Sequence, residues 1–191
     1  MSIGRIAMAA LLAAAAYGQQ FQLGGKVAPF AVQDLTGVSV QSESLSGKVT
    51  VVTFMSTQCP VSNGYNDRMS ALYRDYSAKG VKFIFVNANR TEPAAEVAGH
   101  AKSIGFPFPV YKDLGNKLAD LFGAEVTPQS YVIDSSGTLV YRGQIDDSQN
   151  EARIQRRMLR MVLDAVLEGR PVPVAETKAF GCTIKRVRRM S

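Results

Sequence analysis

Residues 49–55, with the sequence VTVVTFM, are the feature that most constrains what this chain can fold into. The segment is almost wholly apolar and rich in β-branched residues, which is typical of a strand buried on both faces. Residues 81–86, VKFIFV, have the same character. Two such strands predict the centre of a sheet that is covered by a layer of side chains on each side.

Helical spacing of apolar residues recurs between and after these strands. It extends from Tyr65 to Tyr76, where Gly80 ends the helix, and it returns in residues 91–105, 116–122 and 154–165. Strands that alternate with helices indicate an α/β fold built in layers.

Two hairpins complete the predicted sheet. Residues 30–35 and 38–40 flank a Thr-Gly pair, and residues 131–134 and 138–142 flank a Ser-Ser-Gly turn. The chain of 191 residues is long enough for one such domain and shows no internal repeat. We therefore predict a single α/β domain over residues 27–169, with a central mixed β-sheet flanked by helices.

Composition argues against several classes of protein. Apolar residues make up 46% and charged residues 20% of the chain, as in an ordinary globular protein. Two cysteines and one histidine argue against a tetrahedral zinc centre, and no glycine-rich phosphate loop or dinucleotide-binding fingerprint occurs. We therefore predict no metal and no cofactor.

The net charge of +6 is concentrated towards the C-terminus. The basic residues of the last seven positions are Lys185, Arg186, Arg188 and Arg189, so the rest of the chain is close to neutral. This distribution does not favour nucleic acid as a partner. We interpret residues 170–191 as a mobile, solvated tail that carries Cys182. The alternative is a weak contact between this tail and an anionic membrane or an acidic partner.

Residues 1–18 have the three-part pattern of a secretory signal peptide. Arg5 precedes an apolar run over residues 6–16, and small residues then favour cleavage before Gln19. The run is shorter than a membrane-spanning helix requires. We therefore predict a secreted, periplasmic protein, in a compartment where a disulfide can persist.

Cys59 lies where the first central strand gives way to a helix. Backbone N–H groups and the helix dipole at such a position favour the thiolate, which is the reactive form of cysteine. Pro60 suits the first helical turn because its missing N–H is not needed there. The polar residues 56–58 argue against burial, so we predict an exposed, reactive Cys59. The supporting residues predicted around it are Ser56, Thr57, Pro60 and Ser62.

Other polar and aromatic candidates have structural explanations. His100 is interpreted as a solvated helix residue because no second histidine accompanies it. Asp146 and Asp147 are expected to be solvated acids in a polar loop. The tyrosines of the helix after Cys59 are predicted to lie in the core or at its rim: Tyr65, Tyr73 and Tyr76.

Four segments, taken in order, carry a resemblance to a known family. They are Cys59-Pro60, Val126-Thr127-Pro128 before a strand, YRGQIDD at 141–147 and Gly181-Cys182-Thr183-Ile184-Lys185. Over residues 27–186 the chain resembles the peroxiredoxin-like redoxins of bacteria, an AhpC/TSA-type branch of the thioredoxin superfamily. The resemblance implies a thioredoxin-like fold. It also implies that Thr127-Pro128 is a cis peptide that faces Cys59 and lines a groove for the substrate backbone.

The chain departs from the family pattern in two ways. Ser62 stands where a dithiol enzyme has its second cysteine, which excludes a self-contained Cys-x-x-Cys reductase. In the peroxiredoxin motif, Ser56 fits, but Val52 stands where a proline belongs. Arg142, the only arginine near the later strand, lies one hairpin arm too far along the chain. Efficient peroxide reduction is therefore not favoured.

Cys182 has three interpretations, which the residues alone leave open. It could resolve an intermediate on Cys59, form a structural disulfide that fastens the tail, or remain unpaired. A disulfide requires the two α-carbons to approach within about 7 Å. The amino-acid sequence does not show whether Cys59 and Cys182 do so.

The predicted function is that of an exported thiol–disulfide oxidoreductase. Cys59 is its nucleophile, and Cys182 or an external thiol resolves the mixed disulfide. The expected partners are a protein dithiol or disulfide and an external thiol reductant. One alternative is an antioxidant thiol peroxidase whose substrate is a hydroperoxide. A second alternative is a non-catalytic binding module in which a Cys59–Cys182 disulfide is only structural.

Overall fold

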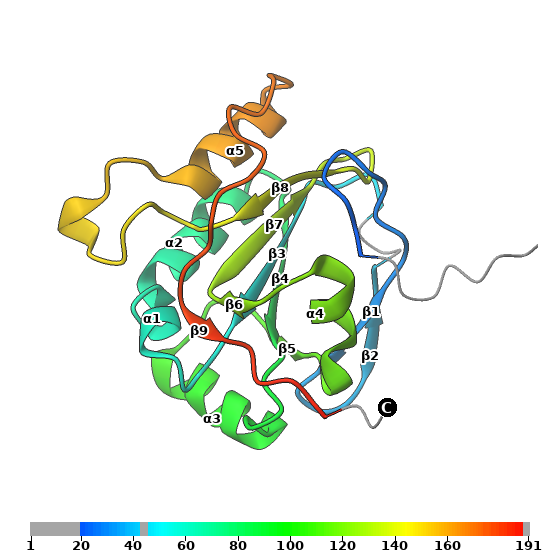
Figure 1. Cartoon of the computed structure of the whole chain (residues 1–191), viewed down its shortest axis with the longest axis vertical. Helices are drawn as coiled ribbons and strands as arrows, with labels where there is room; N and C mark the ends of the chain where they lie inside the picture. Colours follow the sequence, from blue (N-terminus) through cyan, green and yellow to red (C-terminus); the bar gives the residue numbers. More distant parts are fainter. Residues whose placement is uncertain (1–19, 43–45, 189–191) are drawn as a thin grey trace, which may run out of the picture.

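The computed structural model describes residues 20–42 and 46–188, so the predicted signal peptide lies outside the described residues. Seven strands form one sheet in the order β2-β1-β5-β4-β3-β7-β8 (Figure 1). These strands are β1 (Ala31–Asp34), β2 (Ser39–Gln41), β3 (Thr50–Met55), β4 (Lys82–Asn87), β5 (Val110–Lys112), β7 (Gln129–Ile133) and β8 (Leu139–Gly143). Both predicted hairpins form, because β1 pairs antiparallel with β2 and β7 pairs antiparallel with β8.

Strand β3 is at the centre of this architecture. It pairs parallel with β4 and antiparallel with β7, so the sheet is mixed, as predicted. All of its residues are buried, and its apolar residues are divided between two core clusters. Val51 and Met55 belong to one cluster, whereas Val52 and Phe54 belong to the other. The prediction of a strand buried on both faces is confirmed.

Helices cover both faces of the sheet. They are α1 (Pro60–Asn63), α2 (Asn66–Ser77), α3 (Ala94–Ile104), α4 (Lys117–Phe122) and α5 (Met158–Leu167). Buried residues of α2, α3 and α5 pack in the cluster of Val51, whereas those of α4 pack in the cluster of Val52. The predicted α/β fold class is therefore confirmed.

Two helices begin later than their apolar spacing predicts. Helix α3 begins at Ala94 because Pro93 before it has an extended backbone, with φ −60° and ψ 153°. Helix α5 begins at Met158, since Glu151–Arg153 form a separate 3-10 turn and Ile154 is extended. Strand β5 was not predicted, because three residues are too few to show a period.

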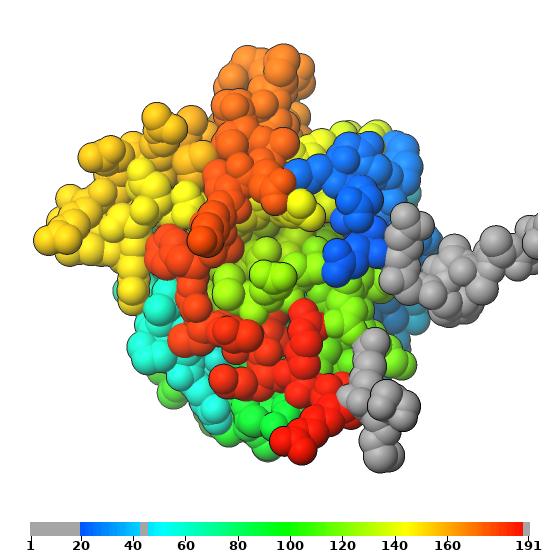
Figure 2. Space-filling view, in the orientation of Figure 1, coloured from blue at the N-terminus to red at the C-terminus, as the bar shows by residue number. Residues whose placement is uncertain are grey.

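The described part of the C-terminal tail, residues 170–188, is held against the domain, so the expectation of a mobile, solvated tail was wrong for these residues. Cys182–Thr183 form β9, which pairs antiparallel with β6 (Val126–Thr127) in a second, two-stranded sheet. Ile184 is only 3% exposed and joins the core cluster of α4. The Arg186 guanidinium contacts both the Asp120 carboxylate and a backbone carbonyl. Figure 2 shows the tail as a continuous band across this face of the molecule.

We predict that Ile184→Ala destabilises the reduced protein by about 2–4 kcal/mol, because it removes buried methyl groups and leaves a cavity. The matched control is Val187→Ala, since the Val187 side chain is 37% exposed. That control is expected to change stability by less than about 0.5 kcal/mol. Denaturant unfolding of both variants measures the difference. Equal stabilities for the two variants would show that Ile184 is not packed once the disulfide is open.

Candidate active site

Cys59 caps the N-terminus of α1, at the turn that follows β3. Its backbone is extended, with φ −90° and ψ 114°, and its Sγ accepts a hydrogen bond from the Ser62 N–H at 3.3 Å. Pro60 is the first residue of the helix. The predicted position of Cys59 at a helix N-terminus is therefore confirmed.

Ser56 and Ser62 fix this turn from the inside. The Ser56 Oγ accepts hydrogen bonds from the Cys59 N–H at 3.1 Å and the Gln58 N–H at 3.2 Å. The Ser62 Oγ accepts one from the Ser56 N–H at 3.0 Å. Ser62 is fully buried. The hydroxyl that stands in place of a second cysteine thus braces the turn, and the Ser62 backbone N–H donates to the Cys59 sulfur.

A disulfide joins Cys59 to Cys182, with the two α-carbons 5.8 Å apart. Strand β9 brings Cys182 to this position because Cys182 lies opposite Thr127 in the β6–β9 pair. The Cys59 Sγ lies 3.4 Å from the Thr127 carbonyl oxygen, and the Thr127-Pro128 peptide bond is cis. The structure therefore brings together four of the predicted site residues. Of the three interpretations of Cys182, it rules out the unpaired thiol.

Gly181 permits the close approach of β9 to the Thr127-Pro128 loop. Its backbone lies at φ +154°, and a Cβ at this position would collide with the Thr127 carbonyl oxygen. A larger residue before Cys182 would therefore push the tail away from β6.

Cys59 is only 2% exposed, so the expectation that its polar neighbours keep it exposed was wrong. Ser56 and Thr57 are themselves buried, at 2% and 9% exposure. Their polar groups turn inward to a carboxylate instead of facing water. Cys182 is half-buried, which makes it the more exposed end of the disulfide.

The carboxylate to which Ser56 and Thr57 donate belongs to Glu92, which is 1% exposed. It accepts hydrogen bonds from the Ser56 hydroxyl at 2.6 Å, and from the Thr57 hydroxyl and N–H at 2.6 and 2.7 Å. Two amides complete the set, the Nδ2 groups of Asn87 and Asn89, each at 2.6 Å. Sequence reasoning missed Glu92 because an isolated glutamate before a helix has no distinguishing pattern.

Burial raises the pKa of Glu92, but its hydrogen-bond donors outweigh burial and hold that pKa below the ordinary value. A buried cation lies in the same network. Lys112 is 5% exposed and donates to the Asn87 side-chain oxygen at 2.6 Å and to the Asn89 carbonyl at 2.7 Å. Burial lowers the pKa of Lys112, while the charge of Glu92 opposes that shift. Asn87 thus connects the two charges.

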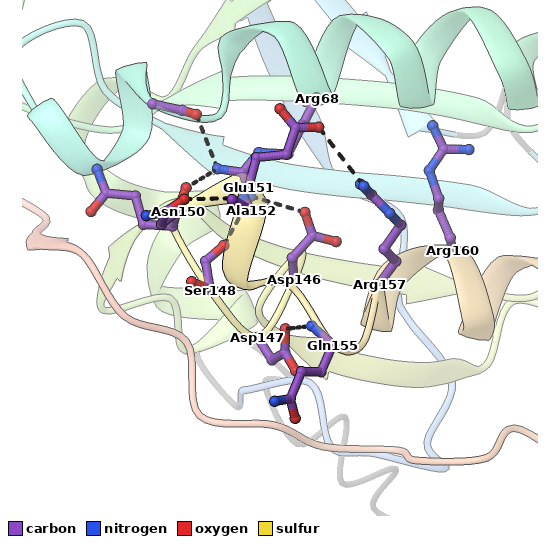
Figure 3. Close-up of polar contacts among 12 residues, drawn as sticks. Arg68, Asp146, Asp147, Ser148, Asn150, Glu151, Ala152, Gln155, Arg157 and Arg160 are labelled. Carbon is purple, nitrogen blue, oxygen red and sulfur yellow. Dashed lines mark hydrogen bonds and ion pairs between the residues drawn. The ribbon is translucent and has the colours of Figure 1, made fainter.

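Asp146 is 3% exposed, so the expectation of a solvated acid was wrong for this residue and holds only for the exposed Asp147. It forms a buried ion pair with Arg68 of α2 at 3.1 Å. Arg68 also donates to backbone carbonyls of Gly64 and of the loop after Asp146 (Figure 3). Burial raises the pKa of Asp146, and Arg68 opposes this shift. The pair fastens this loop to the helix that follows the Cys59 turn.

The aromatic predictions are confirmed, whereas the prediction for His100 was wrong. Tyr65 and Tyr76 are buried in the core, with Tyr73 partly buried against it. His100 is half-buried, because its ring packs 6.0 Å from that of Phe106.

Residues 20–42 and 46–188 contain no group of three His, Cys, Asp or Glu side chains that could hold a metal ion. Over the same residues, no helix is both long and apolar enough to cross a membrane.

Residues 23–142 match the model of the AhpC/TSA family. This chain belongs to that family. It is 32% identical over 122 residues to the thiol-disulfide oxidoreductase ResA of Bacillus thuringiensis strain Al Hakam, a match that covers 64% of this chain and 69% of the relative. The predicted membership and the predicted class of thiol-dependent oxidoreductase are confirmed.

Solved structures support the fold. A conserved protein of uncharacterized function from Geobacillus kaustophilus is 34% identical, with a TM-score of 0.81, and the match covers 91% of this chain and 96% of that one. A thiol:disulfide interchange protein of the thioredoxin family from Chlorobium tepidum is 21% identical, with a TM-score of 0.61, covering 76% and 98%. The predicted thioredoxin-like fold is confirmed.

We predict that Glu92→Gln lowers stability at pH 7 by at least about 2 kcal/mol, because an amide cannot accept all the bonds that the carboxylate accepts. A depressed carboxyl pKa stabilises the fold above its unfolded value, and this contribution is lost as pH falls through the folded value. The gap between parent and variant should therefore shrink below the ordinary pKa of 4.5. Denaturant unfolding from pH 7 to pH 3 measures it. A gap that stays constant over this range would contradict a stabilising ionised Glu92.

Proposed function

We propose that this chain is an exported thiol–disulfide oxidoreductase in which Cys59 is the nucleophile and Cys182 resolves the mixed disulfide. The observation that carries the proposal is the Cys59–Cys182 disulfide, formed between a helix N-terminus and a strand of the tail. Export rests on the signal-peptide pattern of residues 1–18, and it gives a periplasmic location in which this disulfide can persist.

The reaction runs in two exchanges. The Cys59 thiolate attacks one sulfur of a substrate disulfide, forms a mixed disulfide and releases the other substrate sulfur as a thiolate. The Cys182 thiolate then attacks the Cys59 sulfur, closes the internal disulfide and releases the second substrate thiolate. The substrate gains two electrons and the chain loses two. An external dithiol returns them by reducing Cys59–Cys182 and becoming a disulfide itself.

The surroundings of Cys59 support its role as nucleophile and leaving group. The Ser62 N–H points at its sulfur from 3.3 Å, and such a donor stabilises a thiolate. Ser56, Thr57 and Pro60 hold the turn in which this donor is aimed. Cys182 is the more exposed residue of the pair, so we expect the external reductant to attack its sulfur and displace the Cys59 thiolate.

Thr127 and Pro128 are the proposed substrate groove. In the closed disulfide the Thr127 backbone pairs with the chain's own β9. Once the disulfide opens, an extended segment of a protein partner can replace β9 on this edge by strand addition.

Two alternatives remain as outcomes of the tests. A thiol peroxidase needs a cation near the reactive sulfur, but Arg142 of β8 instead forms an ion pair with Glu176 at 2.8 Å. A non-catalytic module needs a disulfide that resists reduction by protein dithiols.

In the reduced protein, we predict that alkylation of Cys59 persists to lower pH than alkylation of Cys182, because the Ser62 N–H at the helix N-terminus favours the Cys59 thiolate. The pH profile is compared instead of the absolute rate because Cys59 is only 2% exposed. Mass spectrometry of each cysteine across a pH series, with Cys59→Ser and Cys182→Ser as references, measures both rates. Identical pH profiles for the two thiols would refute an activated Cys59.

We predict that Cys182→Ser, given a model protein disulfide and no added thiol, stops after the first exchange and accumulates mixed disulfides on Cys59. Ser62→Cys in this background should restore turnover, because it supplies a thiol three residues after Cys59. Ser62→Ala is the matched control and should not. If Cys182→Ser cycles like the parent with the same protein reductant, an external thiol is the resolver.

The same variants separate the alternatives. Rapid consumption of hydrogen peroxide that is lost in Cys59→Ser would favour the peroxidase. A parent disulfide that protein dithiols do not reduce would favour the non-catalytic module.

A further inference from the structure

We infer that Glu92 is a positioning residue for closure of the Cys59–Cys182 disulfide, because one carboxylate holds the Cys59 turn directly and, through Asn89, the tail segment that follows Cys182. The inference rests on the proposed function, since it assigns a role within the same redox pair. It adds a residue that lies outside both cysteine segments.

On the nucleophile side, the carboxylate fixes the turn before α1. The Ser56 hydroxyl donates to Glu92 at 2.6 Å while its oxygen accepts the Cys59 N–H at 3.1 Å. Glu92 also binds the Thr57 N–H at 2.7 Å and its hydroxyl at 2.6 Å. The Ser56 hydroxyl therefore links the Glu92 carboxylate to the backbone N–H of Cys59.

On the tail side, Asn89 connects Glu92 to the segment that follows Cys182. The Asn89 Nδ2 donates to Glu92 at 2.6 Å, and its Oδ1 accepts the Lys185 N–H at 2.6 Å. The Lys185 carbonyl in turn accepts the Arg90 N–H at 2.9 Å. Both backbone groups of Lys185 are therefore held by the loop that carries Glu92.

A carboxylate suits this position better than a neutral side chain. Its two oxygens accept five hydrogen bonds, from two residues of the Cys59 turn and from two asparagine amides. An amide would turn an NH₂ group towards some of these donors. The cost of burying the charge is offset by the donors and by Lys112, which reaches the network through Asn87.

The consequence concerns the reduced protein, in which no covalent bond holds the tail. Non-covalent contacts alone then keep the Cys182 thiol near Cys59, and they set its effective concentration. A variant that loosens the Glu92–Asn89–Lys185 connection lets the reduced tail leave. Closing the disulfide must then order the tail again, which makes the disulfide less stable.

The experiment is redox equilibration of full-length protein with reduced and oxidised glutathione, read by alkylation and mass. We expect Glu92→Gln to lower the equilibrium constant for disulfide closure about tenfold, equivalent to a rise of about 30 mV in reduction potential. The stability losses measured separately in the oxidised and reduced forms should differ by the free energy of that tenfold change, about 1.4 kcal/mol, with the larger loss in the oxidised form. A merely structural role would lower both stabilities equally and leave the potential unchanged, which would overturn the inference.

Asn89→Ala is the second variant, for the case in which Glu92→Gln does not fold. It removes the bond between the Asn89 side chain and the Lys185 N–H. It leaves in place the bond of the Arg90 N–H to the Lys185 carbonyl and the contacts of Glu92 with Ser56 and Thr57. We expect it to weaken closure while the alkylation rate of Cys59 stays at the parent value. A parent-like closure equilibrium in Asn89→Ala would overturn the tail half of the inference.

Glu96→Gln is the matched control. Glu96 lies in the first turn of α3, four residues after Glu92, and accepts hydrogen bonds from the Gln58 side chain at 2.9 Å and the Thr57 hydroxyl at 3.4 Å. It is exposed and makes no bond to Asn89 in the described residues. Its closure equilibrium should equal that of the parent, and an equal loss in Glu96→Gln would overturn the assignment to Glu92. The measurement needs no protein substrate, so a lack of turnover would refute the proposed function without deciding this inference.

Discussion

The backbone pairing of β9 with β6 is the contact on which the active site depends. Cys59 and Cys182 are 123 positions apart, and in an unfolded chain the entropy of closing such a loop is worth about 5 kcal/mol. Folding of the sheet compensates most of this loop-closure entropy, because β7 pairs with β3 and so places the neighbouring β6 beside the Cys59 turn. The tail then needs only a few local contacts to bring Cys182 within bonding distance.

The central architecture was predictable from the sequence because it depends on local patterns. The β3 segment is apolar on both faces, and its alternation places Val51 and Val52 in opposite clusters. The Cys59 turn was predictable for the same reason, since strand, cysteine and proline are adjacent in the chain. The tail was not, because its order comes from isolated contacts with α4, β6 and the loop of Asn89, which produce no period.

Charges explain the remaining errors. Charged side chains are rarely buried without a partner, so composition alone favours a solvated interpretation of each acid. The partners that allow these charges to be buried are distant in the sequence. Asp146 forms an ion pair with Arg68, and Glu92 is connected to Lys112 through Asn87. A single sequence shows neither approach. The prediction that Cys59 is exposed was wrong for the same reason. The carboxylate that accepts hydrogen bonds from the buried Ser56 and Thr57 belongs to Glu92, which follows the next strand in the chain.

The position of the second cysteine on the tail, instead of in a local dithiol, changes what the site can do. In a Cys-x-x-Cys turn, both sulfurs belong to one rigid element, and the substrate edge stays free in both redox states. In this chain Ser62 braces the turn, and the second sulfur arrives on β9, which covers the edge at Thr127. Under the proposed mechanism, internal disulfide and substrate strand exclude each other because both pair with the same backbone. Closure of the disulfide therefore also displaces the product strand, which couples resolution of the intermediate to release.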